Sequence, residues 1–254
     1  MKKSDYIAVF DSGVGGISVL RQLRKDLPNE RYLYFGDSIN APYGVRTEEE
    51  VRQLTIAAAE RLISRGVKAF VIACNTATST SLEVLQERFP EVFVVGSEPA
   101  VALAAGKYPG GHVGVMATPV TLKGSRFLKQ KAQYDSVCRI TPLPAPGLMD
   151  LVEAEKYDSP ETDALLMQLL APHKDTLDAL VLGCTHYPFM MNSLRRVLGD
   201  KVEMLDGAMI TTEQTRRALE QADLLYDGPG EVIIENSLPG DKMLILSRKL
   251  AGLA

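Results

Sequence analysis

Short apolar runs alternate with amphipathic stretches along most of the 254 residues of this chain. The apolar runs are closed by turn-forming residues, a pattern typical of strands that are buried on both faces. The stretches between them repeat apolar residues at helical spacing. Strands that alternate with helices indicate parallel sheets covered by helices. The chain is therefore expected to be an α/β protein, whose ligands bind at the carboxyl ends of the strands.

The pattern predicts the bounds of each element. Strands are expected over residues 6–10, 31–35, 69–73, 93–95, 112–116, 136–140, 179–182, 202–205 and 231–234. Helices are expected over residues 17–26, 47–65, 79–88, 100–106, 122–132, 148–154, 160–172, 190–198, 211–222 and 241–250. Thr47 with Glu50 three residues later predicts a capping box at the start of a helix. After residue 140 a proline-rich stretch (Pro142, Pro144 and Pro146) predicts an irregular connector.

The alternation breaks at Glu98-Pro99 and then begins again. We interpret this as two pseudo-symmetric lobes, each a parallel sheet covered by helices, with the active site in the cleft between them. The length suits two lobes of ~100–150 residues. The first lobe is expected to hold residues 1–98 and 207–254, and the second lobe residues 99–206.

Composition excludes several classes of function. The net charge of −4 gives no basic footprint for nucleic acid. No apolar run reaches the ~18–20 residues of a membrane span, and the N-terminus does not resemble a signal peptide. Three cysteines without a CxxC pattern suit a reducing cytoplasm, and the cysteine and histidine spacing predicts no metal site. The glycine loop after Phe10 lacks a dinucleotide fingerprint, because Ser18 stands where the third glycine is needed.

Two cysteines, Cys74 and Cys184, each follow an apolar strand and precede small hydrogen-bonding residues (Asn75-Thr76 and Thr185-His186). A lone cysteine in such a place is usually a packed core residue, which is our interpretation of Cys138. The residues after the other two can cap helices, and a cysteine at a helix start has a stabilised thiolate. One thiolate and one thiol on opposite walls of a site suit the inversion of a stereocentre, where one group removes a proton and the other delivers one.

Several motifs together resemble the glutamate racemase family of the aspartate/glutamate racemase superfamily. They are Phe10–Gly16, Gly36-Asp37 with Pro42–Gly44, Cys74–Ala77 and Leu182–Pro188. The resemblance runs in the same order from about residue 6 to residue 222. It implies a cofactor-independent enzyme that interconverts L- and D-glutamate between two α/β lobes, supplies D-glutamate for peptidoglycan and works as a cytoplasmic homodimer.

The resemblance also implies roles for individual residues. Cys184 is expected to take the α-proton of L-glutamate and Cys74 that of D-glutamate. Asp11 and His186 match residues that assist Cys74 and Cys184 respectively, and Glu153 matches an acidic residue near the second cysteine. The implied substrate-binding residues are Asp11, Ser12, Pro42, Tyr43, Gly44, Cys74, Asn75, Thr76, Thr118, Thr121, Cys184, Thr185 and His186.

Each assisting residue has a purely structural alternative. Asp11 can cap the turn at Gly13. His186, Thr118 and Thr121 can cap helices, and Glu153 can be a solvated helix residue. The family usually has a Cys-Pro pair before the acidic residue, where this chain has Ala145-Pro146. Rival functions are an aspartate racemase, a decarboxylase that needs one thiol, a non-catalytic amino-acid-binding protein, and a thiol redox enzyme, against which the absence of CxxC speaks.

Overall fold

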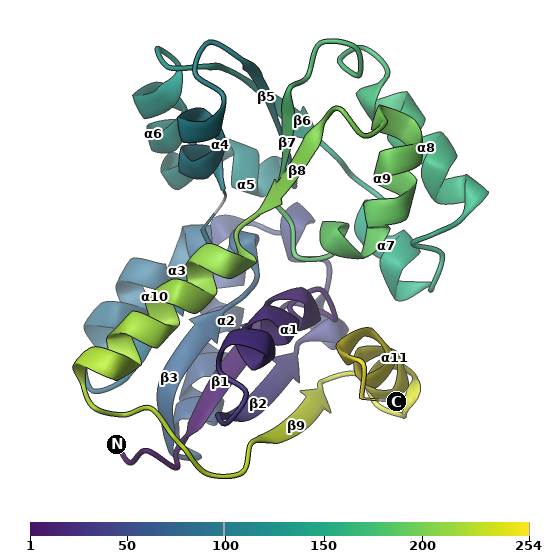
Figure 1. Cartoon of the computed structure of the whole chain (residues 1–254). Coiled ribbons are helices and arrows are strands. Elements are labelled where there is room, and N and C mark those ends of the chain that lie inside the picture. Colours follow the sequence, from purple (N-terminus) through teal and green to yellow (C-terminus); the bar gives the residue numbers. More distant parts are fainter. Residues whose placement is uncertain (99, 254) are drawn as a thin grey trace. The chain divides into compact units, whose positions relative to one another are not determined.

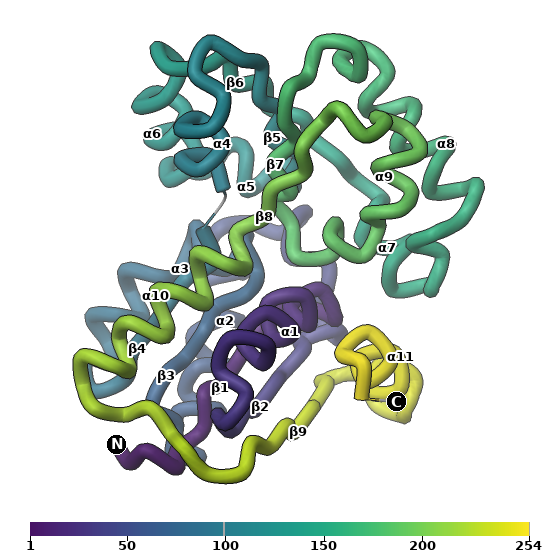
Figure 2. The backbone as a smooth tube through the Cα atoms, in the orientation of Figure 1, coloured from purple at the N-terminus to yellow at the C-terminus, as the bar shows by residue number. Residues whose placement is uncertain are grey.

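The computed structural model describes residues 1–98 and 100–253. These residues divide into a first compact unit, Met1–Glu98 with the chain from Ala208 onward, and a second unit that ends at Gly207. Figure 2 shows that the first and last parts of the chain are interleaved within the first unit. Within the described residues, no helix combines the length and the apolar character needed to cross a membrane.

The first unit contains a parallel sheet of five strands in the order β4-β3-β1-β2-β9. Its strands are β1 (Tyr6–Asp11), β2 (Arg31–Gly36), β3 (Val67–Ile72), β4 (Phe93–Gly96) and β9 (Glu231–Asn236). Figure 1 shows helices on both faces of this sheet. The helices on the near face are α1 (Ile17–Asp26), α10 (Ala208–Gln221) and α11 (Lys242–Ala251), and those on the far face are α2 (Glu48–Ile63) and α3 (Asn75–Arg88).

The second unit contains a parallel sheet of four strands in the order β6-β5-β7-β8. Its strands are β5 (His112–Ala117), β6 (Arg139–Pro144), β7 (Ala179–Leu182) and β8 (Glu203–Asp206). Its helices are α4 (Val101–Lys107), α5 (Pro119–Lys123), α6 (Ser125–Tyr134), α7 (Leu148–Glu153), α8 (Pro160–Leu170) and α9 (Met191–Leu198). Helix α4 packs on β5 and β7, and α8 packs on α9.

The two sheets share one strand order. When the strands are numbered within their own unit, the first sheet reads fourth, third, first, second from β4, and β9 is added at its edge. The second sheet has the same order when it is read from β8 to β6. In both units the strand that precedes the functional cysteine candidate is the third, β3 for Cys74 and β7 for Cys184. The predicted α/β fold with two helix-covered parallel sheets is therefore confirmed, and the repeat places both cysteines at equivalent strand ends.

A strand is present where one was expected over residues 136–140, but the expected bounds are wrong, because β6 runs through Arg139–Pro144 and takes in part of the proline-rich connector. An edge strand pairs on one side only, so alternate residues need no partner for their backbone nitrogen. Pro142 and Pro144 are two residues apart, and among the described strands β6 pairs only with β5. The prolines are therefore compatible with the edge of the sheet.

Three helix starts also differ from the prediction. Helix α3 begins at Asn75 rather than at residue 79, and α10 begins at Ala208 rather than at residue 211. The helix expected over residues 122–132 is two helices, α5 and α6, which meet at Gly124.

The predicted capping box is confirmed: Thr47 Oγ1 accepts a bond from the Glu50 nitrogen (3.3 Å), and Glu50 Oε2 accepts one from the Thr47 nitrogen (2.9 Å).

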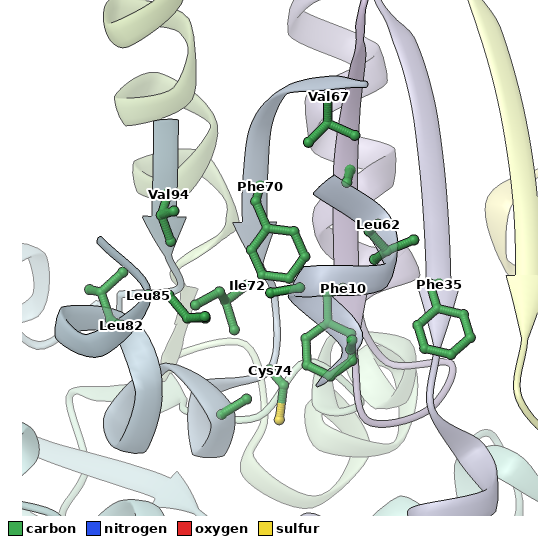
Figure 3. Close-up of a cluster of buried hydrophobic side chains, with 14 of the residues drawn as sticks. Phe10, Phe35, Leu62, Val67, Phe70, Ile72, Cys74, Leu82, Leu85 and Val94 are labelled. Carbon is green, nitrogen blue, oxygen red and sulfur yellow. The ribbon is translucent and has the colours of Figure 1, made fainter. Parts of the chain in front are cut away.

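A cluster of buried aromatic and aliphatic side chains fills the space between the first sheet and helices α2 and α3. The ring of Phe10 stacks on Phe70 with a centroid distance of 6.0 Å and on Phe35 at 6.3 Å. Figure 3 shows Cys74 at the end of this cluster, beyond Ile72 and Phe10, with its sulfur directed away from Phe70. The packed core therefore fixes the backbone beneath Cys74 while its thiol stands at the rim.

Candidate active site

Cys74 joins the buried strand β3 to helix α3. All six residues of β3 are buried, and Cys74 is the N-cap residue of the helix with a side chain that makes no capping bond. Its Sγ lies 3.4 Å from Ser12 Oγ, a hydrogen-bond distance for sulfur in which either atom can be the donor. Because the thiol sits at the start of a helix of 14 residues, the helix dipole favours its thiolate form.

Asp11 ends β1, the strand beside β3, and its side chain is fully buried. Its Oδ1 accepts a bond from the backbone nitrogen of Gly13 (3.0 Å), so the structural role expected for this carboxylate is present. The same strand end carries Ser12, which reaches Cys74. The carboxyl edge of the first sheet therefore brings together a carboxylate, a hydroxyl and a thiol from two neighbouring strands.

Asp37, the second residue of the Gly36-Asp37 motif, follows β2 at the same edge. Its buried carboxylate accepts bonds from the Tyr43 hydroxyl (2.7 Å) and from Asn40 Nδ2 (3.0 Å). Burial and the charge of Asp37 raise the pKa of Tyr43 above its ordinary value, so the phenol remains a hydrogen-bond donor. Asp37 therefore anchors the loop that holds Pro42, Tyr43 and Gly44, which includes a cis bond before Pro42.

Asn75 and Thr76 are the first residues of α3 rather than its caps, which corrects the expected capping role. Among the described residues, the buried Oδ1 of Asn75 has no hydrogen-bond partner. A buried amide oxygen without a partner is costly, so such an atom at the start of α3 indicates a place for a ligand donor.

Cys184 follows β7 at the carboxyl edge of the second sheet. A histidine contacts its sulfur, and a carboxylate contacts that histidine. Cys184 Sγ is 3.7 Å from His186 Nδ1, and His186 Nε2 is 3.3 Å from Glu153 Oε1. His186 is 1% exposed, whereas Cys184 is partly exposed. In such a series of thiol, imidazole and carboxylate, the carboxylate orients the imidazole, and the imidazole can exchange a proton with the sulfur.

The connector before Glu153 takes a defined course although it lacks the family's usual Cys-Pro pair. The buried hydroxyl of Tyr187 donates to the Ala145 carbonyl (3.0 Å), and Gly147 adopts a left-handed conformation (φ 82°) before α7. Glu153 is the last residue of α7 and faces His186. The solvated position considered for Glu153 is therefore wrong, because its side chain is only 15% exposed.

The other polar residues expected in the second unit also follow its strands. Thr118 caps α5 by accepting a bond from the Thr121 nitrogen (3.3 Å), and its hydroxyl donates to Thr121 Oγ1 (3.0 Å). Thr185 is buried beside Cys184 in sequence. His186 does not cap a helix with its side chain. Among residues 1–98 and 100–253, no group of three or more His, Cys, Asp and Glu side chains is arranged to hold a metal ion.

Comparison with known proteins decides the family. The family described as Asp/Glu/hydantoin racemases matches residues 17–215, which is most of the chain. The chain belongs to this racemase family. The resemblance seen in the sequence motifs is thereby confirmed, and as a member of a racemase family the chain is an isomerase.

Full-length relatives of the racemase family agree. A curated glutamate racemase of Clostridium botulinum (strain Alaska E43 / Type E3) is 40% identical over 252 residues, covering 98% of both chains. The glutamate racemase isoform RacE1 from Bacillus anthracis has a TM-score of 0.89 at 30% identity and covers 98% of this chain and 95% of its own. Escherichia coli glutamate racemase, solved with L-glutamate and the activator UDP-MurNAc-ala, has a TM-score of 0.84 at 30% identity, with 96% and 95% covered.

Proposed function

We propose that this chain interconverts L- and D-glutamate by proton transfer at the α-carbon, without a cofactor, and so supplies D-glutamate for peptidoglycan. The observation that carries the proposal is the repeated strand order, with a cysteine after the third strand of each sheet. The 40% identity to a curated glutamate racemase supports glutamate as the substrate.

Inversion of the α-carbon needs two groups of opposite protonation state that reach the same carbon from opposite faces. In the L-to-D direction, the thiolate of Cys184 takes the α-hydrogen as a proton, and the electron pair of the C–H bond stays on the α-carbon beside the carboxylate. The thiol of Cys74 then gives its proton to the other face of that carbon. The two cysteines exchange protonation states, and D-glutamate reacts through the same steps in reverse.

Different neighbours assist the two thiols in this proposal. Asp11 and Ser12 are the polar groups at the strand end beside Cys74, with Ser12 Oγ 3.4 Å from its sulfur. His186, backed by Glu153, is the partner of Cys184 at 3.7 Å. Ser12 and His186 lie within hydrogen-bond distance of the two sulfurs, so in this proposal each of them holds its own thiol in a fixed position for proton transfer.

The substrate carries an ammonium group and two carboxylates, which need both acceptors and donors. The unpartnered Oδ1 of Asn75 can accept a bond from the ammonium group. The backbone N–H groups at the start of α3 suit a carboxylate. The remaining residues proposed to bind glutamate are Asp11, Ser12, Pro42, Tyr43, Gly44, Thr76, Thr118, Thr121, Thr185 and His186, all of which follow strands or end them in their own units.

The test is racemisation of purified protein in D₂O with no added cofactor, followed by circular dichroism and by mass spectrometry of the α-hydrogen. Glutamate is expected to lose optical activity and to take up deuterium, and aspartate is compared in the same assay. Cys74→Ala and Cys184→Ala are expected to abolish racemisation, whereas Cys138→Ala, a buried cysteine before β6, is the matched control and retains it. Full racemisation in Cys74→Ala contradicts the two-base mechanism, and a preference for aspartate contradicts the substrate.

The proposal includes a homodimer located in the cytoplasm, with glutamate as the small-molecule partner and no nucleic acid. Light scattering coupled to size-exclusion chromatography is expected to give twice the mass of the 254-residue chain. A monomer that is fully active contradicts the dimer and leaves the proposed reaction intact.

A further inference from the structure

Thr78 lies in the first turn of α3, four residues after Cys74, and has no role in the chemistry described above. Its side chain is 2% exposed, and its backbone nitrogen donates to the Cys74 carbonyl (2.9 Å). A threonine inside a helix commonly bonds its hydroxyl to the carbonyl four residues back. Thr55 in α2 does so, with Oγ1 2.7 Å from the Val51 carbonyl. Thr78 instead directs its hydroxyl out of its own helix.

The hydroxyl of Thr78 joins the ends of two strands to the start of the helix. Its Oγ1 donates to the carbonyl of Ile72, the last residue of β3 (3.0 Å). The backbone nitrogen of Ser97, which directly follows β4, donates both to Thr78 Oγ1 (3.0 Å) and to the Ile72 carbonyl (2.9 Å). The three atoms form a closed triangle in which every polar group is satisfied. All three residues belong to the first unit.

The methyl group of Thr78 is held as firmly as the hydroxyl. A Cβ atom added at Gly96 would lie 2.5 Å from Thr78 Cγ2 and 3.0 Å from Leu82 Cδ2, so the methyl occupies the space above this glycine. Both branches at the Cβ of Thr78 therefore have fixed neighbours. Since threonine has few χ1 rotamers, these two contacts determine its conformation.

We propose that Thr78 is a positioning residue for Cys74 in the proposed racemisation. The bond from Thr78 Oγ1 to the Ile72 carbonyl closes the chain around the corner that carries the thiol, with Ile72 two residues before Cys74 and Thr78 four residues after it. Without this bond the start of α3 is free to shift against the end of β3. The Cys74 sulfur then loses its fixed distance to Ser12 Oγ, which is 3.4 Å. The inference rests on the proposed function.

Two single substitutions separate the hydroxyl from the methyl. Thr78→Val keeps the shape and the methyl above Gly96 but removes both bonds of the hydroxyl, and Thr78→Ser keeps the hydroxyl and removes the methyl. We expect Thr78→Val to lower kcat about tenfold, because small misplacement of a reacting group is costly in rate. Thr78→Ser is expected to stay within about twofold of the parent chain. Thr55→Val, which removes a buried hydroxyl bonded within α2, is the matched control for lost stability and is expected to keep kcat.

The decisive readout compares the two faces of the substrate. With α-deuterated D-glutamate, whose deuterium Cys74 removes, the isotope effect on kcat/KM is expected to rise in Thr78→Val. With α-deuterated L-glutamate, whose deuterium Cys184 removes, it is expected to fall towards one. A general loss of folded protein lowers the rate without moving either isotope effect. Unchanged isotope effects in both directions, or kcat equal to that of the parent chain, would overturn the proposal.

A second readout does not depend on racemisation. Iodoacetamide labelling followed by peptide mass spectrometry gives the alkylation rates of Cys74 and Cys184 in the same sample. In Thr78→Val the rate at Cys74 is expected to change at least about threefold while that at Cys184 stays constant, because the thiolate fraction depends on its local partners. Equal rates at Cys74 in the parent chain and in Thr78→Val contradict the positioning role. An inactive parent chain contradicts the proposed function alone, since the labelling comparison still stands.

Discussion

A buried ion pair at the amino ends of the first sheet gives a sharp test of what stabilises that unit. Lys68 Nζ lies 2.6 Å from Glu30 Oε2, and their side chains are 0% and 2% exposed. Lys68 also donates to the carbonyls of Lys3 (2.6 Å) and Leu224 (2.8 Å), while Glu30 Oε1 accepts a bond from the Tyr226 nitrogen (2.9 Å). The pair therefore ties the chain that follows α10 to strand β3 and to the N-terminal segment.

Replacing Lys68 by methionine leaves the buried carboxylate of Glu30 without its counter-charge and removes the Lys68 donor from two carbonyls. Breaking one side of a buried ion pair costs ~3–5 kcal/mol, because the remaining charge is desolvated and uncompensated. Against a typical unfolding free energy of ~5–15 kcal/mol, this is a large fraction of the stability. With a denaturant slope of about 2 kcal/mol/M, the urea midpoint is expected to fall by about 2 M.

The measurement is urea unfolding followed by far-ultraviolet circular dichroism. Lys3→Met is the matched control, because Lys3 pairs with Asp223 on the surface, where their side chains are 48% and 91% exposed and solvent screens the attraction between them. The double variant Glu30→Gln/Lys68→Met is expected to be more stable than Lys68→Met, since it no longer buries an unpaired charge. A loss of less than about 1 kcal/mol in Lys68→Met would refute this reasoning.

Three further predictions concern the second unit. Burial lowers the pKa of His112 below its ordinary value of 6.5. The neutral form therefore stabilises the fold above about pH 6.5, and that contribution is lost as the pH falls. The unfolding free energy should drop less between pH 7 and pH 5 in His112→Gln than in the parent chain. Tyr187→Phe leaves the buried Ala145 carbonyl without its donor and should cost ~1–3 kcal/mol in thermal unfolding. Glu153→Gln removes the carboxylate behind His186 and should lower kcat about tenfold at neutral pH, and an unchanged kcat argues against any part for Glu153 in the reaction.

The sequence predicts the strands well wherever a run is buried on both faces. Strands β1, β3 and β5 are almost wholly buried, so hydrophobicity alone marks them. The bounds of strand β6 escape prediction because only Ile140 and Leu143 are buried, at a spacing that does not alternate, and because the strand includes two prolines. Only its position at the edge of the sheet makes those prolines acceptable, and an edge position is a property of the tertiary structure.

The candidate site divides in the same way. The cysteines and their neighbours are visible in the sequence because each directly follows a strongly apolar strand. The contact between Glu153 and His186 joins residues 33 positions apart and depends on the course of the connector before α7, which short-range pattern does not determine. Asp37 and Thr78 are missed as positioning residues because their bonds reach other loops and strand ends. The signal available for Asp37 was its place directly after a strand, at the same sheet edge as Asp11.

The likeness of the two units stops at the sheets, and this determines which experiments can tell the two thiols apart. Cys74 has a hydroxyl and a buried carboxylate near it, whereas Cys184 has an imidazole backed by a carboxylate. In water the two enantiomers of glutamate have equal free energy, so kcat/KM must be equal in both directions for every variant at every pH. Damage to one thiol therefore leaves no asymmetry in kcat/KM for unlabelled substrate. The damage to that thiol is visible in the isotope effects measured from each enantiomer and in kcat and KM taken separately, because these quantities depend on which proton transfer limits the rate.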